Sequence, residues 1–253
     1  MILLLLAACA GPPAVVGKVV DIWGNPVPEA TVVIEGVVEM YHADQAGLFR
    51  IETEAPVTRV MAGKPGFIKD VELIAAPPAE GEDYAPMTFQ LYPEPEKPGF
   101  YAVGHTDYVA LAAQRIVMVG TELKHYAGLR DIPGTGLGRG KQRFVFTSKL
   151  RPSDLMRMNL HLSKLSFVSH TPVKGLLGPM DATVNLWIAE EDVPFDLEQL
   201  PSRDDYLIST RGPLDAGMYA FHAQDVLAEQ DERVFLMLPK EMQVAFPFEV
   251  NGT

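Results

Sequence analysis

The sequence predicts an all-β protein built from two β-sandwiches in succession. Three observations carry this prediction. Short segments alternate apolar and polar residues with a period of two, and clusters of Gly, Pro and Asp separate these segments. No segment shows a helical periodicity longer than about three turns. A proline-rich run at 94–99 is typical of a stiff linker and favours two domains, 15–93 and 100–253.

The first domain is expected to be a series of short strands. The segments with strand-like alternation are Val15–Asp21, Ala30–Glu35, Leu48–Glu52 and Met87–Tyr92. Turn-forming residues follow the first two segments, at 23–26 and 44–47. In the third segment Phe49 and Ile51 fall on the same face, so both are expected to lie in the core. Residues 77–83 are predicted to form an acidic loop.

The order and spacing of small and apolar residues in this domain resemble the carboxypeptidase regulatory-like family. The matching positions are Gly17, Val19, Asp21, Gly24, Pro26, Val27, Ala30 and Val32, then Asp44, Gly47 and Phe49, then Ala62, Lys64, Gly66 and Phe67. The resemblance covers about 80 residues and implies a seven-stranded, transthyretin-like sandwich that is structural and not catalytic. Gly24 and Gly47 suit turns that need left-handed geometry, and Asp21 and Asp44 can accept backbone hydrogen bonds there.

The second domain, residues 100–253, is expected to be a larger sandwich of the jelly-roll or immunoglobulin-like type. Its predicted strands are 100–105, 114–119, 142–147, 158–163, 183–188, 217–223, 233–238 and 242–250, the last two joined by a turn at 239–241. The residues expected in its core are Val184, Leu186, Leu236, Val244, Phe246 and Phe248. Helical turns are expected only at 192–200 and 224–230. Residues 133–140 are predicted to form a glycine-rich loop.

The single cysteine, Cys9, ends an apolar run closed by two small residues, Leu3–Cys9. This run resembles the lipobox of bacterial lipoproteins. The resemblance implies a signal peptide at 1–8, an acylated Cys9 at the start of a tether at 9–14, and, with Ala10 next, sorting to the outer membrane. The leader has no basic residue, which a secretory signal usually carries, so an upstream start is an alternative. The run is too short to span a bilayer, which takes about 20 apolar residues.

The composition limits the classes of function. The net charge of −12 argues against nucleic acid as a partner, because nucleic-acid binding needs a basic surface. With Cys9 acylated, no thiol remains for a disulfide, so core packing has to hold the fold together in an oxidising envelope. A chain of 253 residues that is 47% apolar is large enough to build two cores.

The glycine-rich segment 134–141 does not fit a nucleotide-binding motif. A phosphate-binding loop needs Gly at the position of Thr135 and Ser or Thr at the position of Gln142. The segment instead carries positive charge on an otherwise acidic protein. The residues Arg139, Lys141 and Arg143, with Arg130 nearby in sequence, are therefore the candidate partner-binding patch.

No catalytic residue, metal ion or cofactor is expected from the motifs. The six histidines lack metal-ligand spacing, and no serine lies in a Gly-x-Ser-x-Gly turn. Two pairs put polar side chains on one strand face, His105 with Asp107 and His161 with Ser163. The alternative is that distant strands bring His105, His161 or His222 together. The aromatic residues that suit a sugar-binding face are Trp187, Tyr101, Tyr108, Tyr126 and Tyr219.

These observations favour a non-catalytic envelope lipoprotein that acts as an adaptor or binding module, with an envelope protein or a polysaccharide as its partner. One alternative is a carbohydrate- or peptidoglycan-binding module that uses aromatic residues of the second domain. The other alternative is an enzyme with its site in residues 100–253.

Overall fold

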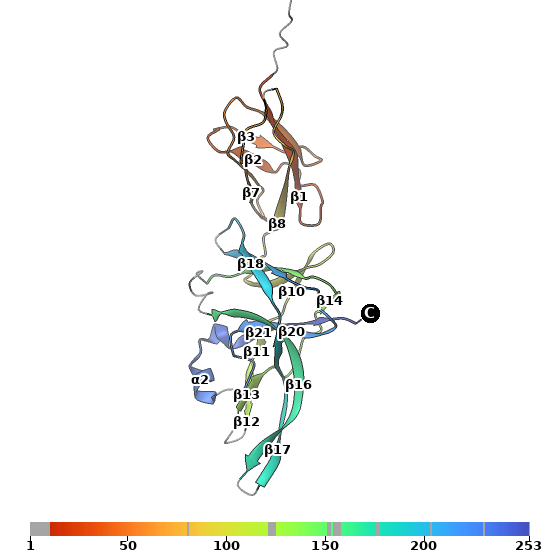
Figure 1. Ribbon diagram of the computed structural model, residues 1–253, viewed down its shortest axis with the longest axis vertical. Coiled ribbons are helices and arrows are strands. Elements are labelled where there is room, and N and C mark those ends of the chain that lie inside the picture. The colour runs from red at the N-terminus through yellow and green to blue at the C-terminus, as the bar shows by residue number, and fades with distance from the viewer. Residues whose placement is uncertain are drawn as a thin grey trace, which may run out of the picture. The chain divides into compact units, whose positions relative to one another are not determined.

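The computed structural model describes residues 11–79, 81–120, 125–150, 153, 158–175, 178–202, 204–229 and 231–252. The all-β fold class is confirmed, because strands dominate and helix α2 (Glu232–Met237) has only six residues (Figure 1). The chain divides into two compact units. Unit 1 comprises Met1–Glu96 with Leu200–Arg203, and unit 2 comprises Lys97–Gln199 with Asp204–Thr253.

Unit 1 contains two four-stranded sheets. The first has the order β4 (Leu48–Glu52), β1 (Ala14–Asp21), β8 (Met87–Pro93) and β6 (Phe67–Ile68); the second has the order β3 (Met40–His42), β2 (Thr31–Ile34), β5 (Arg59–Gly63) and β7 (Asp70–Leu73). Only β1 and β8 pair in parallel among these strands. One hydrophobic core draws on both sheets and includes Val32, Ile34, Phe49, Ile51 and Phe89. Phe49 and Ile51 are therefore buried, as their alternation predicts.

The turns of unit 1 form as predicted. Asp21 Oδ1 accepts hydrogen bonds from the backbone N–H groups of Trp23 and Asn25. Asp44 Oδ1 does the same for Ala46 and Leu48. Gly24 and Gly47 both have positive φ, at 86° and 74°. These carboxylates take up backbone donors that the turns would otherwise leave without partners.

Unit 2 contains two larger sheets that face each other. The five-stranded sheet has the order β10 (Tyr108–Ala110), β9 (Gly99–Val103), β15 (Arg143–Thr147), β19 (Asp205–Thr210) and β18 (Phe195–Gln199). The six-stranded sheet has the order β11 (Gln114–Arg115), β21 (Val244–Val250), β20 (Gly217–Ala223), β16 (Leu160–Gly175) and β17 (Gly178–Asp192), with β14 (Gly136–Leu137) paired to β21. Phe144, Phe221 and Phe248 are fully buried in the core that the two sheets share.

The longest element of unit 2 is the hairpin of β16 and β17, which extends well beyond the sheet (Figure 1). A separate two-stranded sheet, β12 (Val117–Gly120) with β13 (His125–Gly128), contacts β17. The hairpin buries apolar residues in two clusters. Leu165 belongs to a cluster with Phe235, and Val184 and Leu186 belong to a cluster with Tyr126.

The structure contradicts the local predictions for 233–238 and 192–200 in unit 2. Segment 233–238 is not a strand but lies in helix α2 (Glu232–Met237), because Asp231 caps its N-terminus by accepting from Arg233 N. Leu236 is accordingly 65% exposed and not in the core. Segment 192–200 contains strand β18 instead of helical turns. Segment 133–140 is mostly irregular, as predicted for a glycine-rich loop, and includes the two-residue strand β14, which pairs with β21.

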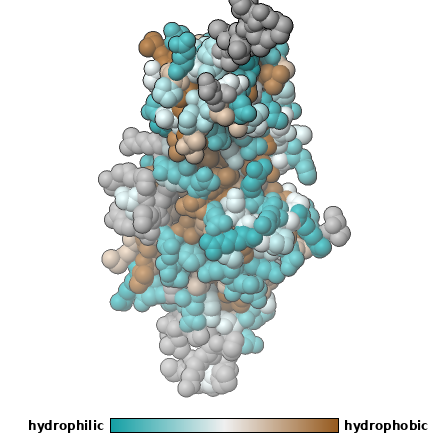
Figure 2. Space-filling view, turned by 45° about the horizontal axis from the view of Figure 1, so that its top comes forward, coloured by the Kyte–Doolittle hydropathy of each residue, from teal (hydrophilic) through white to brown (hydrophobic). Residues whose placement is uncertain are grey.

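Several apolar side chains remain exposed. They include Val38 and Met40 in unit 1 and Phe167, Leu236 and Met237 in unit 2. The space-filling view shows hydrophobic side chains reaching the surface between hydrophilic ones (Figure 2). Among the described residues, the structure contains no helix that is both long enough and apolar enough to span a membrane.

Candidate functional site

A network of polar side chains lies where β16, β17 and β20 meet. His161 and Ser163 share one face of β16, as the period of two predicts. In the antiparallel register His161 pairs with His222 of β20, and Ser163 pairs with Ala220. The two imidazole rings therefore stack, with their centroids 6.0 Å apart.

A β-bulge brings the carboxylate of Asp192 to this face. Lys164 pairs with Glu191, but the next residue, Leu165, pairs with Ala189, so Glu190 has no partner on β16. One extra residue inverts the alternation of side chains beyond it. Asp192 consequently lies on the same face as Ala189 and pairs with Ser163.

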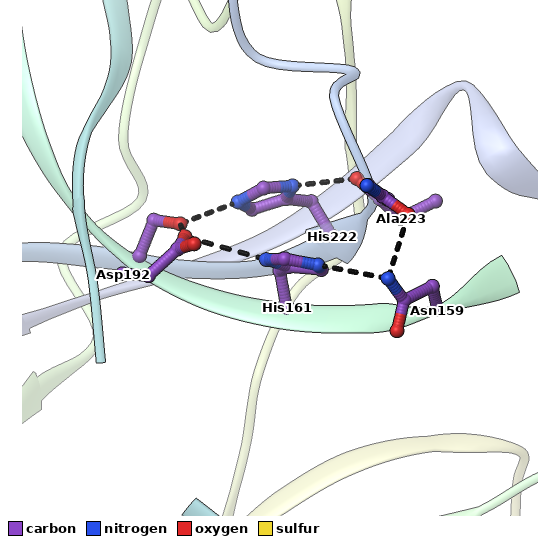
Figure 3. A network of polar contacts seen from close by, with 7 residues as sticks. Asn159, His161, Asp192, His222 and Ala223 are labelled. Atoms are coloured by element: carbon purple, nitrogen blue, oxygen red, sulfur yellow. Dashed lines mark hydrogen bonds and ion pairs between the residues drawn. The ribbon is translucent and has the colours of Figure 1, made fainter. Parts of the chain in front are cut away.

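Hydrogen bonds of 2.9–3.3 Å connect these groups (Figure 3). Ser163 Oγ lies 2.9 Å from His222 Nε2 and 2.9 Å from Asp192 Oδ1. His161 Nδ1 donates to the same Asp192 Oδ1 over 3.3 Å. At the far end, Asn159 Nδ2 donates to His161 Nε2 over 3.2 Å. His161 is thus a donor at one ring nitrogen and an acceptor at the other, which fits a neutral imidazole.

The remaining contacts fix the tautomer of His222. Its Nδ1 lies 2.7 Å from the carbonyl oxygen of Ala223. A carbonyl oxygen can only accept, so Nδ1 carries a proton. Ser163 then has one donor hydrogen for two acceptors. Its hydroxyl can donate either to His222 Nε2 or to Asp192 Oδ1, but not to both. The network therefore has room for a single further proton, and with that proton on Nε2 both short contacts become hydrogen bonds.

Burial controls the charge states in the network. Ser163 has no exposed surface and His222 is only 5% exposed. Burial lowers the pKa of His222 below the usual imidazole value, although the hydrogen bond to Ala223 acts in the opposite direction. For Asp192, partial desolvation raises the pKa, but the hydrogen bonds from Ser163 and His161 outweigh it and hold the pKa below its usual value.

The network differs in two respects from a catalytic nucleophile with its base. Ser163 and His222 form the hydrogen bond expected of a nucleophile and its base. A nucleophile must reach its substrate, however, and Ser163 is completely buried. Asp192 also contacts Ser163 directly and does not orient the ring of His222.

A cavity of about 400 Å³ borders this network in unit 2. Its lining includes Phe100, Phe146, Phe221 and Phe246. Phe100 contacts the other three rings at centroid distances of 4.2 Å, 4.5 Å and 4.7 Å, respectively. His222 is also among the lining residues. A volume of this size, an aromatic lining and few polar groups are typical of a site for a small organic molecule.

The polar residues of the lining are mostly engaged within the protein. Thr147 Oγ1 donates to Asp205 Oδ1 over 2.6 Å, and Ser148 Oγ accepts from the N–H of Leu150. Lys149 and Glu241 are exposed side chains in the lining. The cavity thus presents an apolar interior and two charged side chains that remain accessible to solvent.

The candidate patch of Arg139, Lys141 and Arg143 lies on the surface of unit 2. All three side chains are exposed and, within the described part of the chain, form no ion pair. Arg143 is on β15, whereas the other two follow β14 in the glycine-rich segment. Gln142 Nε2 donates to the carbonyl oxygens of Gly138 and Gly140 and so braces this segment. Cys9 lies outside the described residues.

Two of the three histidine candidates come together in the structure. His161 and His222 come together, but no contact joins His105 to either of them among the described residues. Within that same part of the chain, no group of three or more His, Cys, Asp or Glu residues is placed to hold a metal ion.

The aromatic candidates do not form one face. Tyr126 and Tyr219 are buried in different clusters. Tyr101 contacts Tyr108, with the ring centroids 5.9 Å apart. Trp187 contacts Phe167, which is 50% exposed, at 5.3 Å.

The sequence contains a signal for part of the network. The alternation at 158–163 places His161 and Ser163 together, and His222 lies on a predicted strand. The sequence pattern does not identify Asp192 or Asn159. Asp192 is positioned by a bulge, and Asn159 by a positive φ of 44° just before β16, and alternation encodes neither feature.

Comparison with known proteins finds no match: no protein-family model fits the chain, and no curated protein is significantly similar to it.

Proposed function

We propose that the protein is a non-catalytic binding module of the bacterial cell envelope, held at the outer membrane by a lipid on Cys9. Its ligand is a small organic molecule that occupies the aromatic cavity of unit 2. An envelope protein or a polysaccharide is the further partner, for which the exposed Arg139, Lys141 and Arg143 offer a basic surface. Nucleic acid is not a partner, since the net charge is −12.

The aromatic cavity is the observation that carries this proposal. Its lining includes four phenylalanine rings that pack on one another beside a space of about 400 Å³, and pockets of roughly 300–1,000 Å³ are typical for small ligands. Phe246 is only half-buried, so the cavity offers an aromatic side chain to an incoming molecule. The buried position of Ser163 argues for binding instead of hydrolysis.

The binding of dansylglycinamide, a neutral fluorescent probe with an apolar body, tests the cavity. We expect its fluorescence to rise on binding the intact protein, because the dansyl group enters an apolar site. Leu160→Trp places a larger side chain in the lining and should weaken binding at least about tenfold, or about 1.4 kcal/mol. Leu197→Trp makes the same change on an exposed residue outside the lining and should leave binding unchanged.

Two results would count against the cavity. Wild-type protein that fails to bind the probe would overturn it, as would equal binding by both tryptophan variants. Phe246→Ala provides a second check, because loss of one aromatic wall should weaken binding without filling the space.

The lipid anchor has its own test. Cys9→Ser should move the protein from the membrane fraction to the soluble fraction, because the acyl chains are the only anchor proposed. Metabolic labelling with an alkyne fatty acid should mark the wild-type protein and not the variant. A wild-type protein that stays unlabelled would refute the anchor while leaving the cavity proposal intact.

A further inference from the structure

His222 belongs to two features of unit 2 at once. It is part of the cavity lining, and its ring is the buried end of the polar network. At the other end of the network, the side chain of Asp192 is 69% exposed to solvent. Hydrogen-bond contacts therefore run from solvent at Asp192, through the hydroxyl of Ser163, to an imidazole beside the cavity.

The network can take one proton from solvent without moving a heavy atom. The proton that is missing between Ser163 and its two neighbours fits on His222 Nε2. Nε2–H then donates to Ser163 Oγ, and the Ser163 hydroxyl donates to Asp192 Oδ1. The result is an imidazolium ring beside an apolar cavity, with both of its N–H groups already bonded inside the protein.

Titratable groups on five elements act on this ring or line the cavity beside it. They are His161 on β16, Asp192 on β17, Asp225 in the turn after β20, Lys149 after β15, and Glu241 in the 3₁₀-helix Lys240–Met242. Asp192 and Asp225 favour a proton on His222, whereas His161 opposes it when His161 is itself protonated. Of the two charged side chains in the cavity lining, Lys149 opposes the proton and Glu241 favours it, and both are exposed and screened by solvent.

We infer that the cavity takes amphipathic ligands with an aromatic or aliphatic body and a carboxylate head group, and that binding draws one proton onto His222. The inference rests on the proposed function of the cavity. A carboxylate beside the ring stabilises the imidazolium, as any nearby opposite charge does. Lys149 offers the same head group a second cation. The four phenylalanine rings hold the apolar body.

Without a ligand, protonation of His222 is unfavourable. Burial lowers the pKa of His222, so the free protein holds a neutral ring at neutral pH. An anionic ligand reverses this preference and must therefore bind together with a proton. A neutral ligand of the same shape has no such requirement, and its affinity should not depend on the state of His222.

Dansylglycine and dansylglycinamide separate these cases, because they differ only in the charge of the head group. We expect the affinity of the intact protein for dansylglycine to rise about tenfold between about pH 8.5 and about pH 6, across the range in which histidine titrates. The affinity for dansylglycinamide should change by less than about twofold. Calorimetry in two buffers with different ionisation enthalpies should show proton uptake with dansylglycine, up to one proton per chain, and none with the amide.

The outcomes distinguish this inference from the proposal on which it rests. If neither probe binds, the proposed function itself fails. If both probes bind with equal pH dependence, or dansylglycine binds without proton uptake, the carboxylate preference is overturned while the cavity stands. Calorimetry needs only the wild-type protein, so the measured proton uptake does not depend on whether any variant folds.

Variants then locate the proton. His222→Gln should lose both the pH dependence and the proton uptake for dansylglycine, and its circular dichroism spectrum, compared with that of the wild-type protein, reports correct folding. His170→Gln removes an exposed histidine of β16 that is outside the lining and should keep the full pH dependence. A His222→Gln protein that still takes up a proton with dansylglycine would show that His222 is not the acceptor.

Discussion

The polar contacts within unit 1 and those within unit 2 differ in the distance along the chain between partners. In unit 1, Asp21 and Asp44 accept hydrogen bonds from backbone groups two and four residues away. In unit 2, Ser163 contacts Asp192 and His222 across 29 and 59 residues. The first kind of contact forms wherever a turn forms. The second exists only when three strands have the correct register.

This difference explains what each set of residues can do. Asp44 is exposed and Asp21 is half-buried, and each carboxylate accepts from neighbouring backbone donors, so both act on local stability. The network of unit 2 is buried at one end and leaves a proton position open. A buried group with an incomplete set of hydrogen bonds responds to its surroundings far more strongly than an exposed one.

The largest effect is expected from a turn of unit 1. Gly47 has φ of 74°, and a Cβ there would lie 2.4 Å from the carbonyl oxygen of Val19. Gly47→Ala should therefore lower the free energy of unfolding by roughly 3 kcal/mol, since left-handed strain and a backbone clash add. Urea unfolding followed by Trp23 fluorescence in a Trp187→Phe background measures this.

The matched control is Gly24→Ala. Gly24 has φ of 86°, but nothing lies within 4 Å of its added Cβ, so only the strain of about 1 kcal/mol remains. Equal losses for the two variants would mean that the close approach of Val19 does not matter.

Sequence patterns predict the parts of unit 1 that depend on local chemistry. Glycine and aspartate favour turns because of their own chemistry, and the alternation of apolar and polar residues predicts that Phe49 and Ile51 are buried. The same reasoning fails at 233–238, where an apolar run suggests a strand. There, Asp231 caps a short helix, and of the helical residues Phe235 is the one that is buried. A strand in this place would need the edge of a sheet to pair with.

The second prediction concerns the long-range contacts of unit 2. Ser163→Ala should lower the free energy of unfolding by about 2 kcal/mol, because it leaves the buried His222 Nε2 without a partner. Trp187 fluorescence in a Trp23→Phe background reports on this unit.

Ser166→Ala is the control for this change. Ser166 is half-buried on the opposite face of β16, and its loss should cost less than about 0.5 kcal/mol. If the two variants are equally stable, the network contributes nothing to the fold.

The site could be predicted from the sequence only in part. His161 and Ser163 share a strand face, and this follows from alternation alone. Their partner Asp192 does not follow, because Glu190 forms a bulge that inverts the pattern. The pairing with His222 depends on which strands become neighbours in the sheet, and this is decided by packing of the whole unit.

The smallest expected effect is a pH dependence of the stability of unit 2. The pKa of His222 is lower in the folded chain than the usual value of 6.5, so the unfolded chain binds more protons in this range. Stability therefore rises with pH. The contribution of His222 is complete above the unfolded pKa and is lost as the pH falls below about 6.5, with a slope of at most about 1.4 kcal/mol per pH unit.

Urea unfolding between about pH 7.5 and about pH 5, followed by Trp187, should show this loss. His222→Gln should flatten the curve, whereas His170→Gln should leave it unchanged, since His170 is exposed. Asp192 does not interfere, because its own pKa lies below the usual carboxylate value and its contribution is lost only at more acidic pH. Dansylglycine should reduce the loss on acidification, because its carboxylate stabilises the same imidazolium that burial disfavours. A wild-type curve as flat as that of His222→Gln would mean that burial does not disfavour protonation of the ring. The network of unit 2 would then not differ from the turn carboxylates of unit 1 in its response to pH.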